Sequence, residues 1–394
     1  MSDLRPGRGP ATPARPGSVR PWRHFHRLAW LAVGLALGVI VFGAFVRLSD
    51  AGLSCPDWPT CYGKATWPTA VEHGDGHAAT SIRPVEVHKA WREQVHRIIA
   101  GLLGVLTLAL ALLAARRRER GMLQVVAASA LVAIAIPLYM QGMYVAASVL
   151  AVAGELVLLA AAVRWDNRDL SRVGALTLAV IIFQALLGMW TVTWLLKPIV
   201  VMAHLLGGLL TFSLLLWMAW RATNLPIRLA QARQLHRLVA VGLVLLGVQI
   251  ALGGWTSANY AALSCGLDFP TCVGQWWPPT DFREGFVLWR GIGVDYEGGV
   301  LDGEARIAIQ MAHRIGAVVV ASYLLWLALR MLRTPGIRGW ASVLGILVLV
   351  QFGLGIANVK LGLPLGNAVA HNAGAVLLLA VLVSLLARLR APEA

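Results

Sequence analysis

Four histidines occupy matching places in the two halves of this sequence. The stretch "WREQVHRIIAGLLG" aligns with "IAIQMAHRIGAVVV", which pairs His96 with His313. Farther along each half, a glutamine comes 20 residues before a histidine, and this interval pairs His204 with His371. Two neutral imidazoles from facing helices suit the axial positions of a buried haem iron. The pattern predicts one haem between two histidines in each half, and it lacks the further ligands of a zinc site.

The two halves differ one helical turn before the first histidine of each. Glu93 lies three residues before His96, whereas Gln310 holds the same place before His313. Residues three apart share a helix face. A carboxylate can take a proton or stabilise a cation, which an amide cannot do. If only one half is reactive, it is therefore the first, with Glu93 as its catalytic residue. The alternative for Glu93 is an interfacial acid.

Arginines accompany these sites. Arg97 directly follows His96, and Arg314 directly follows His313. Arg47 belongs to the same class but has no counterpart in the second half. All three suit haem propionates, which favour charge-assisted hydrogen bonds near the interface. The alternative is that they reach from the helices to the membrane surface.

The elements that position these residues are predicted to be membrane helices. The chain is 58% hydrophobic and 13% charged, whereas a soluble domain has about 25% charged residues. A run of roughly 20 apolar residues can span a bilayer, and it must be helical to satisfy its backbone. Ten such runs are predicted, at 28–48, 93–115, 122–141, 145–163, 173–194, 199–220, 237–257, 306–330, 338–358 and 366–388.

The spans are organised as an internal repeat. Both halves begin on the same side of the membrane, so we predict an all-α integral membrane protein built as a tandem parallel repeat of two four-helix bundles. The N-terminal bundle covers 28–220 and the C-terminal bundle covers 237–390. A helical hairpin at 122–163 has no partner in the second half and is inserted in the first. Residues 1–27 are rich in Pro, Gly and Arg and are predicted to form a disordered tail.

The charge distribution indicates the orientation of the chain. With the N-terminus inside, the inner segments hold 22 of the 34 Lys and Arg residues. This is the positive-inside bias, so the net charge of +15 is a topology signal and not evidence for nucleic-acid binding. The N-terminus is predicted to be cytoplasmic.

All four cysteines lie in two similar loops, which the topology places outside. The loops read "LSCPDWPTC" and "LSCGLDFPTC", with Cys55 and Cys61 in the first and Cys265 and Cys272 in the second. Each pair spans a short loop, so its Cα atoms can come within bridging distance, and the outer face is oxidising. A structural bridge and a redox-active pair both remain open.

Taken together, "GAFVRLSDAGLSCPDWPTCYG", "KAWREQVHR" and the later "AH" histidines resemble the haem A synthase family over about residues 28–388. Members oxidise the C8 methyl of haem O to a formyl group, giving haem A for haem-copper terminal oxidases. The family fold has eight spans in two bundles, so the 122–163 hairpin departs from it.

The resemblance also implies roles for particular residues. His96 and His204 would hold the substrate haem, and Glu93 would be the essential acid. His313 and His371 would hold a haem b. The outer cysteines would form disulfides, and of these Cys55 and Cys61 would matter for activity.

The resemblance further implies a place in the cell. The protein would lie in the bacterial inner membrane with its cysteine loops periplasmic. Its partners would be membrane lipid, the haem O synthase and terminal oxidase assembly factors. The oxygen source, the electron acceptor and any homo-oligomer are left open.

Two other functions fit parts of the pattern. A two-haem b-type cytochrome that oxidises quinol would need no chemical difference between the halves, which the contrast between Glu93 and Gln310 disfavours. A membrane thiol oxidase using the outer cysteines would hold no haem. Haem content separates these functions.

Overall fold

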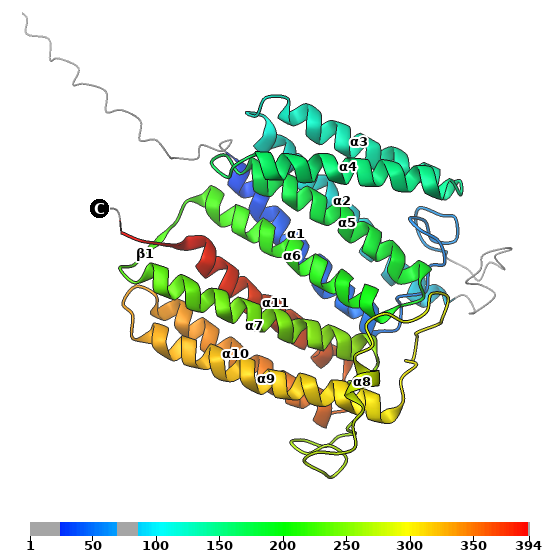
Figure 1. Cartoon of the computed structure of the whole chain (residues 1–394), viewed down its shortest axis with the longest axis vertical. Coiled ribbons are helices and arrows are strands. Elements are labelled where there is room, and N and C mark those ends of the chain that lie inside the picture. Colours follow the sequence, from blue (N-terminus) through cyan, green and yellow to red (C-terminus); the bar gives the residue numbers. More distant parts are fainter. Residues whose placement is uncertain (1–23, 69–85, 393–394) are drawn as a thin grey trace, which may run out of the picture.

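Helices make up nearly the whole fold. The computed structural model describes residues 24–68 and 86–392, so nearly all of the tail predicted at 1–27 lies outside the described residues. Within those ranges, ten helices are long and apolar enough to cross a membrane, as the sequence predicted (Figure 1). They are α1 (Phe25–Leu48), α2 (Val87–Ala115), α3 (Gly121–Met140), α4 (Tyr144–Arg164), α5 (Ser171–Thr193), α6 (Pro198–Thr223), α7 (Ala232–Ala258), α9 (Gly303–Leu332), α10 (Arg338–Lys360) and α11 (Leu365–Arg388).

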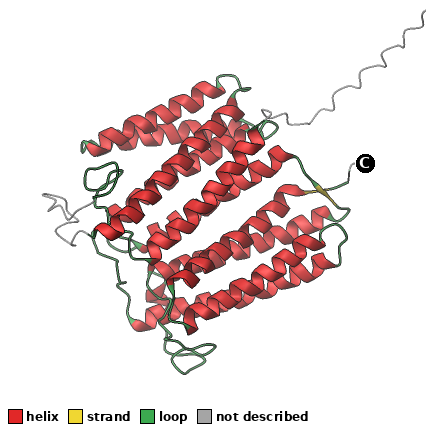
Figure 2. Ribbon diagram, turned by 180° about the vertical axis from the view of Figure 1, so that it is seen from behind, coloured by secondary structure: helices red, strands yellow, loops and turns green. Residues whose placement is uncertain are grey.

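The remaining elements are short. Helix α8 (Phe282–Gly285) lies between α7 and α9, and β1 (Ile227–Arg228) pairs in parallel with β2 (Leu389–Arg390) (Figure 2). Several long helices begin earlier than their apolar runs. For example, α9 starts at Gly303 because Asp302 caps it, with Oδ1 accepting from Ala305 N at 2.8 Å.

The eight repeated helices pack as two rings of four. In the first ring α1 contacts α2 and α6, and α5 contacts the same two helices. In the second ring α7 contacts α9 and α11, and α10 contacts the same two. In both rings, therefore, the first and third helices of the bundle each contact its second and fourth helices. The residue limits of the two predicted bundles stay a prediction.

The inserted hairpin lies outside the first ring. Helices α3 and α4 pack against each other, while α3 also contacts α2 and α4 also contacts α5 (Figure 1). The turn between them includes Gly142 at φ 79°, a left-handed conformation that glycine adopts without strain. The hairpin therefore widens the first bundle along its α2 and α5 side.

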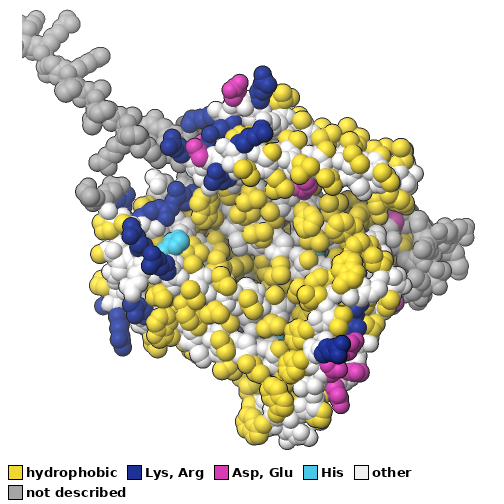
Figure 3. Space-filling view, in the orientation of Figure 1, with side chains coloured by type: hydrophobic (Ala, Val, Ile, Leu, Met, Phe, Trp, Pro, Cys, Tyr) yellow, Lys and Arg dark blue, Asp and Glu magenta, His cyan; other side chains and the backbone are white. Residues whose placement is uncertain are grey.

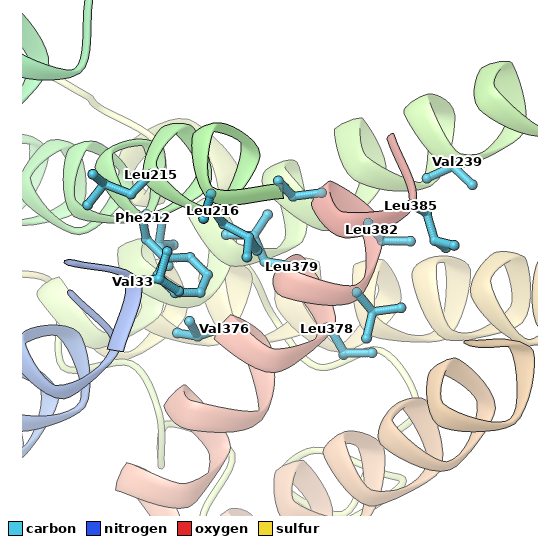
Figure 4. Close-up of a cluster of buried hydrophobic side chains, with 14 of the residues drawn as sticks. Val33, Phe212, Leu215, Leu216, Val239, Val376, Leu378, Leu379, Leu382 and Leu385 are labelled. Atoms are coloured by element: carbon cyan, nitrogen blue, oxygen red, sulfur yellow. The ribbon is translucent and has the colours of Figure 1, made fainter. Parts of the chain in front are cut away.

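The two bundles share an apolar interface. Phe212, Leu215 and Leu216 of α6 belong to one buried cluster with Val33 of α1 and with Val376, Leu379 and Leu382 of α11 (Figure 4). Inside a membrane, close packing and interhelical hydrogen bonds hold helices together. The indole of Trp220 on α6 adds such a bond to Ser384 Oγ on α11, at 2.8 Å.

The outer surface has the character of a membrane protein. Large apolar side chains face outward along the helices, for example Val145 at 81% and Val163 at 78% exposure. Lys and Arg gather at the end of the helices where the C-terminus lies, and the surface between the two ends is mostly apolar (Figures 1 and 3). The opposite end carries the two cysteine loops, at 49–68 and 259–302, and is called the loop end below.

Candidate functional site

The four repeated histidines line one large cavity. It has a volume of about 2650 Å³ and extends through both bundles, between otherwise mostly apolar side chains. His96 on α2 and His204 on α6 face it in the first bundle, and His313 on α9 and His371 on α11 face it in the second. Within each bundle the two imidazoles are close enough to interact electrostatically. The structure thus brings together the pairs that the sequence predicted.

Each imidazole packs against a glycine of a neighbouring helix. A Cβ atom built on Gly43 would lie 2.8 Å from His96 Cε1, and one on Gly188 would lie 3.0 Å from His204 Cε1. In the second bundle the corresponding distances are 3.1 Å for Gly253 and His313 and 3.2 Å for Gly355 and His371. Only glycine leaves the imidazoles where they are. Sequence reasoning missed these four glycines.

Three of the four histidines are also held by a glutamine. Gln184 Nε2 donates to the carbonyl of His204 at 2.7 Å. The two equivalent bonds in the second bundle are both 3.0 Å long and join Gln249 to His313 and Gln351 to His371. These bonds fix the helix that carries the histidine against the helix before it.

Each glutamine passes over a second glycine. A Cβ atom built on Gly207 would lie 2.2 Å from Oε1 of its glutamine. The same distance would be 2.3 Å at Gly316 and 2.1 Å at Gly374. The result is a paired signal, Q-x-x-x-G on one helix and H-x-x-G on the next, which could have been found in the sequence. It is absent at His96, where Val39 stands four residues before Gly43 and Ile99 stands three after the histidine.

The donor set fits a haem better than a bare metal ion. Each bundle presents two imidazoles to a mostly apolar cavity. Within the described ranges, no cluster of three or more His, Cys, Asp and Glu side chains could hold a metal ion. Two histidines across an apolar space match the axial pair of a haem iron.

Glu93 holds the first cysteine loop. Its Oε2 accepts hydrogen bonds from Ser54 N at 2.8 Å, from Cys55 N at 2.9 Å and from Ser54 Oγ at 3.1 Å. Its Oε1 pairs with Arg97 at 2.5 Å. The side chain is 5% exposed and lines the cavity one turn from His96. Thus Glu93 joins the loop to the helix that carries the histidine.

Gln310 does not reproduce this arrangement. Its side chain is also buried, but its Oε1 has no hydrogen-bond partner in the part of the chain that the structure describes. Ser54 Oγ and Ser264 Oγ both donate to the carbonyl three residues earlier in their loops, but the further partner of Ser264 Oγ is the backbone carbonyl of Arg306 and not a carboxylate. The chemical difference seen in the sequence is therefore also a difference in how the two loops are anchored.

Arg97 and Arg314 hold backbone carbonyls of the cysteine loops. Arg97 donates to Asp57 O and Thr60 O, both at 2.7 Å. Arg314 donates to the equivalent carbonyls of Asp268, at 2.8 Å, and Thr271, at 2.9 Å. Both arginines also line the cavity. Contact with haem propionates stays a prediction for them.

Arg47 connects the two bundles. Its guanidinium donates to Ser257 O at 3.0 Å and stacks on the ring of Tyr260, 4.6 Å from the centroid. Because Ser257 lies in the last turn of α7 and Tyr260 follows that helix, Arg47 ties the end of α1 to the second half. It too lines the cavity, and its predicted contact with a propionate remains untested.

The cysteines form one disulfide in each loop, Cys55 with Cys61 and Cys265 with Cys272. Their Cα atoms are 4.8 and 4.6 Å apart, and all four residues are buried. Each bridge packs against the helix that bears the first histidine of its bundle, at Ala90 of α2 and at Met311 of α9. A redox role remains a prediction, whereas the pairing is observed.

Several known proteins are similar to this chain over nearly its whole length. A Heme A synthase of Shewanella oneidensis is 39% identical over 366 residues, which are 91% of this chain and 96% of the relative. A Heme A synthase of Rhizorhabdus wittichii is 28% identical over 397 residues, 95% of this chain and 94% of the relative. A third, from Granulibacter bethesdensis, is 27% identical and covers 97% of this chain and 95% of its own.

A family match covers the same region. The pattern of the COX15-CtaA family, described as cytochrome oxidase assembly protein, matches residues 26–150 and 142–383. These ranges contain both histidine pairs, both cysteine loops and the inserted hairpin. With most of its length matched, the chain belongs to the COX15-CtaA family of cytochrome oxidase assembly proteins.

Proposed function

We propose that this protein makes haem A by oxidising the C8 methyl of haem O to a formyl group. The observation that supports this function is a duplicated histidine site whose two copies differ in the side chain one helical turn away. Glu93 stands at the first pair and Gln310 at the second, in a chain similar to Heme A synthases over nearly its whole length. In this proposal the first bundle binds the substrate haem and the second binds a haem b.

The residues of the first bundle would position the substrate. His96 and His204 hold the iron and so fix the ring, while Gly43 and Gly188 fix the two imidazoles. The apolar cavity takes up the isoprenoid tail. Formation of the aldehyde removes electrons and protons from the methyl carbon and adds oxygen. Glu93 would take a proton or stabilise positive charge there.

The second bundle would carry electrons away. Held by His313 and His371, haem b supplies one-electron chemistry when it is bound. Gln310 is neutral in every protonation state available to it, which suits a bundle that transfers electrons without acid–base work. The receiving molecule would be an external acceptor.

The proposed location is the bacterial inner membrane. The ten helices that are long and apolar enough would span it, and the Lys- and Arg-rich end would be cytoplasmic under the positive-inside rule. The cysteine loops would then be periplasmic, where disulfides persist. Proposed partners are the haem O synthase and terminal oxidase assembly factors.

Haem analysis of the purified protein tests this function. Haem extracted from it should separate by chromatography into haem b and either haem O or haem A. Haem b alone would favour the quinol-oxidising cytochrome instead, and a protein without haem would favour the thiol oxidase.

Histidine substitutions should deplete one haem and spare the other. We expect His313→Ala and His371→Ala to lose haem b, and His96→Ala and His204→Ala to lose haem O and haem A. Each substitution removes an iron ligand. Each loss of haem should therefore exceed the roughly 10-fold loss that follows substitution of a residue beside a metal ligand. The check is the visible spectrum together with haem extraction. Unchanged low-spin haem b in both second-bundle variants would refute the second site.

The two disulfides should differ in importance. Loss of either bridge removes up to about 2–4 kcal/mol of stability, less for short loops. However, the first bridge holds in place the loop whose Cys55 N donates to Glu93. The loop of Cys265 has no carboxylate anchor at Gln310. Cys55→Ala should therefore lower the ratio of haem A to haem O more than Cys265→Ala, at equal amounts of membrane protein. Equal ratios would contradict this expectation.

A further inference from the structure

The inserted hairpin brings an acidic side chain to the cavity. Glu155 on α4 lines the same cavity as His96 and His204, and so does Ser129 on α3. Glu155 Oε1 and Ser129 Oγ are both buried without a hydrogen-bond partner among residues 24–68 and 86–392. A carboxyl group within a membrane helix is costly unless something binds it. These two groups are therefore candidates for contact with a ligand.

Close packing fixes the two groups at the cavity wall. Helices α3 and α4 meet at Gly154, where a Cβ would lie 2.8 Å from Ala128 O and 3.0 Å from Val132 Cγ2. Ala128 and Gly154 are the direct neighbours of Ser129 and Glu155 in the chain. The Glu155 carboxyl also lies within hydrogen-bond range of the Phe183 backbone on α5, so the group without a partner among the described residues is its Oε1. The position of Glu155 thus follows from the hairpin and α5 together.

Glu155 lies deeper than the iron ligands of the first bundle. Helix α4 starts at the loop end with Tyr144, so Glu155 is about 16 Å along it at 1.5 Å per residue. By the same measure His96 is about 13 Å along α2, and His204 about 9 Å along α6. A ring held by these histidines would have Glu155 on its side that points away from the loops.

The chemistry of haem O gives that edge a matching group, an argument that rests on the proposed function. Haem O carries its propionates on one edge of the macrocycle and its hydroxyethylfarnesyl group on the opposite edge. The propionates favour the polar loop end, so the hydroxyl points toward the deeper wall. A carboxyl oxygen accepts a hydrogen bond from a hydroxyl whether or not the acid is protonated.

We propose that Glu155 and Ser129 bind the hydroxyl of the hydroxyethylfarnesyl group of haem O, and that α3 and α4 line the channel for its isoprenoid chain. The wall around them is apolar, with Val132, Val152 and Leu156 also lining the cavity. The inserted hairpin thereby selects a farnesylated haem over haem b in the first bundle.

The substitution Glu155→Leu tests the proposal. The full-length variants Glu155→Leu, Ser129→Ala and Glu155→Gln are produced in cells that supply haem O, and extracted haems are separated by chromatography. We expect Glu155→Leu to lower the ratio of haem O plus haem A to haem b about 10-fold or more, since a buried hydroxyl loses its acceptor. Ser129→Ala should have a smaller effect, and Glu155→Gln should retain most haem O because an amide oxygen also accepts.

Two controls separate this site from the fold and from the proposed function. Gln124→Leu removes a buried amide from α3 whose Oε1 is also unpartnered, away from the cavity lining, and should leave the ratio unchanged. Haem b in the second bundle reports an intact fold. A parent protein with neither haem O nor haem A would contradict the proposed function and this site with it. A parent that carries them, with the same ratio in Glu155→Leu, would overturn the tail site alone.

A titration with two haems gives a second readout. Haem-depleted membranes of the parent and of Glu155→Leu are titrated with haem O and with haem b. The parent should bind haem O more tightly at its first site, whereas Glu155→Leu should lose about 10-fold of affinity for haem O and none for haem b. Equal losses for both haems would show a general disturbance of the cavity and would overturn the assignment.

Discussion

Glu93→Gln is expected to stop haem A formation while haem binding continues. The change replaces a carboxylate that accepts hydrogen bonds from Ser54 and Cys55 and pairs with Arg97. Hydrogen bonds to a charged group contribute about 1.5–3 kcal/mol each, so loss of one such bond corresponds to roughly a 10- to 100-fold effect. With the acid lost as well, we expect conversion to fall at least 100-fold. The measurement is the haem A to haem O ratio in cells.

A reciprocal substitution serves as the control. Gln310→Glu adds a carboxylate at the equivalent place in the second bundle, which takes no part in substrate chemistry under the proposed function. It should leave conversion within about 2-fold of the parent. Thiol labelling of Glu93→Gln should show Cys55 and Cys61 still bridged, which separates loss of the acid from loss of the disulfide. Normal haem A production by Glu93→Gln would refute the catalytic assignment.

Gly43→Ala is expected to empty the substrate site. The new Cβ would lie 2.8 Å from His96 Cε1 and 3.2 Å from Nε2, distances at which the imidazole must move. A closely packed interior relaxes only partly. The imidazole of His96 would therefore move away from the place where it would hold the iron. We expect haem O and haem A bound to the purified protein to fall about 10-fold or more, with haem b retained.

The same helix supplies a matched control. Apart from the nearby backbone of its own helix, no atom of the described residues lies within 4 Å of a Cβ built on Gly34 of α1, so Gly34→Ala should bind both haems normally. Gly253→Ala, at 3.1 Å from His313 Cε1, should deplete haem b and spare haem O. If Gly43→Ala and Gly34→Ala retain the same amount of haem O, the glycine does not set the position of His96.

The chemical groups of the site were largely predictable because the chain repeats itself. Four histidines that recur with the same spacing mark a site without any knowledge of the fold, since an ionisable group is rare in a membrane helix. The glycines that face the histidines are also present in the sequence. However, a glycine among apolar residues has no distinguishing chemistry. Its role depends on a contact with another helix.

The partners of the arginines were not predictable. Arg97 and Arg314 follow the histidines, and from sequence they suited propionates. In the structure both guanidinium groups hold carbonyls of the cysteine loops. The loop backbone folds back over the helix only in three dimensions, and its carbonyls leave no mark in the residue pattern.

By itself the sequence determined the ten spans, the four paired histidines, the cysteine loops and the contrast between Glu93 and Gln310. These depend on hydrophobic length and on residue type, which are local properties. Tertiary structure alone decided which helix faces meet, and therefore that Glu155 reaches the cavity and that Arg97 and Arg314 hold loop carbonyls. The physical reason is that lipid and protein interior are equally apolar. A membrane helix thus carries no polar stripe to show which side is buried.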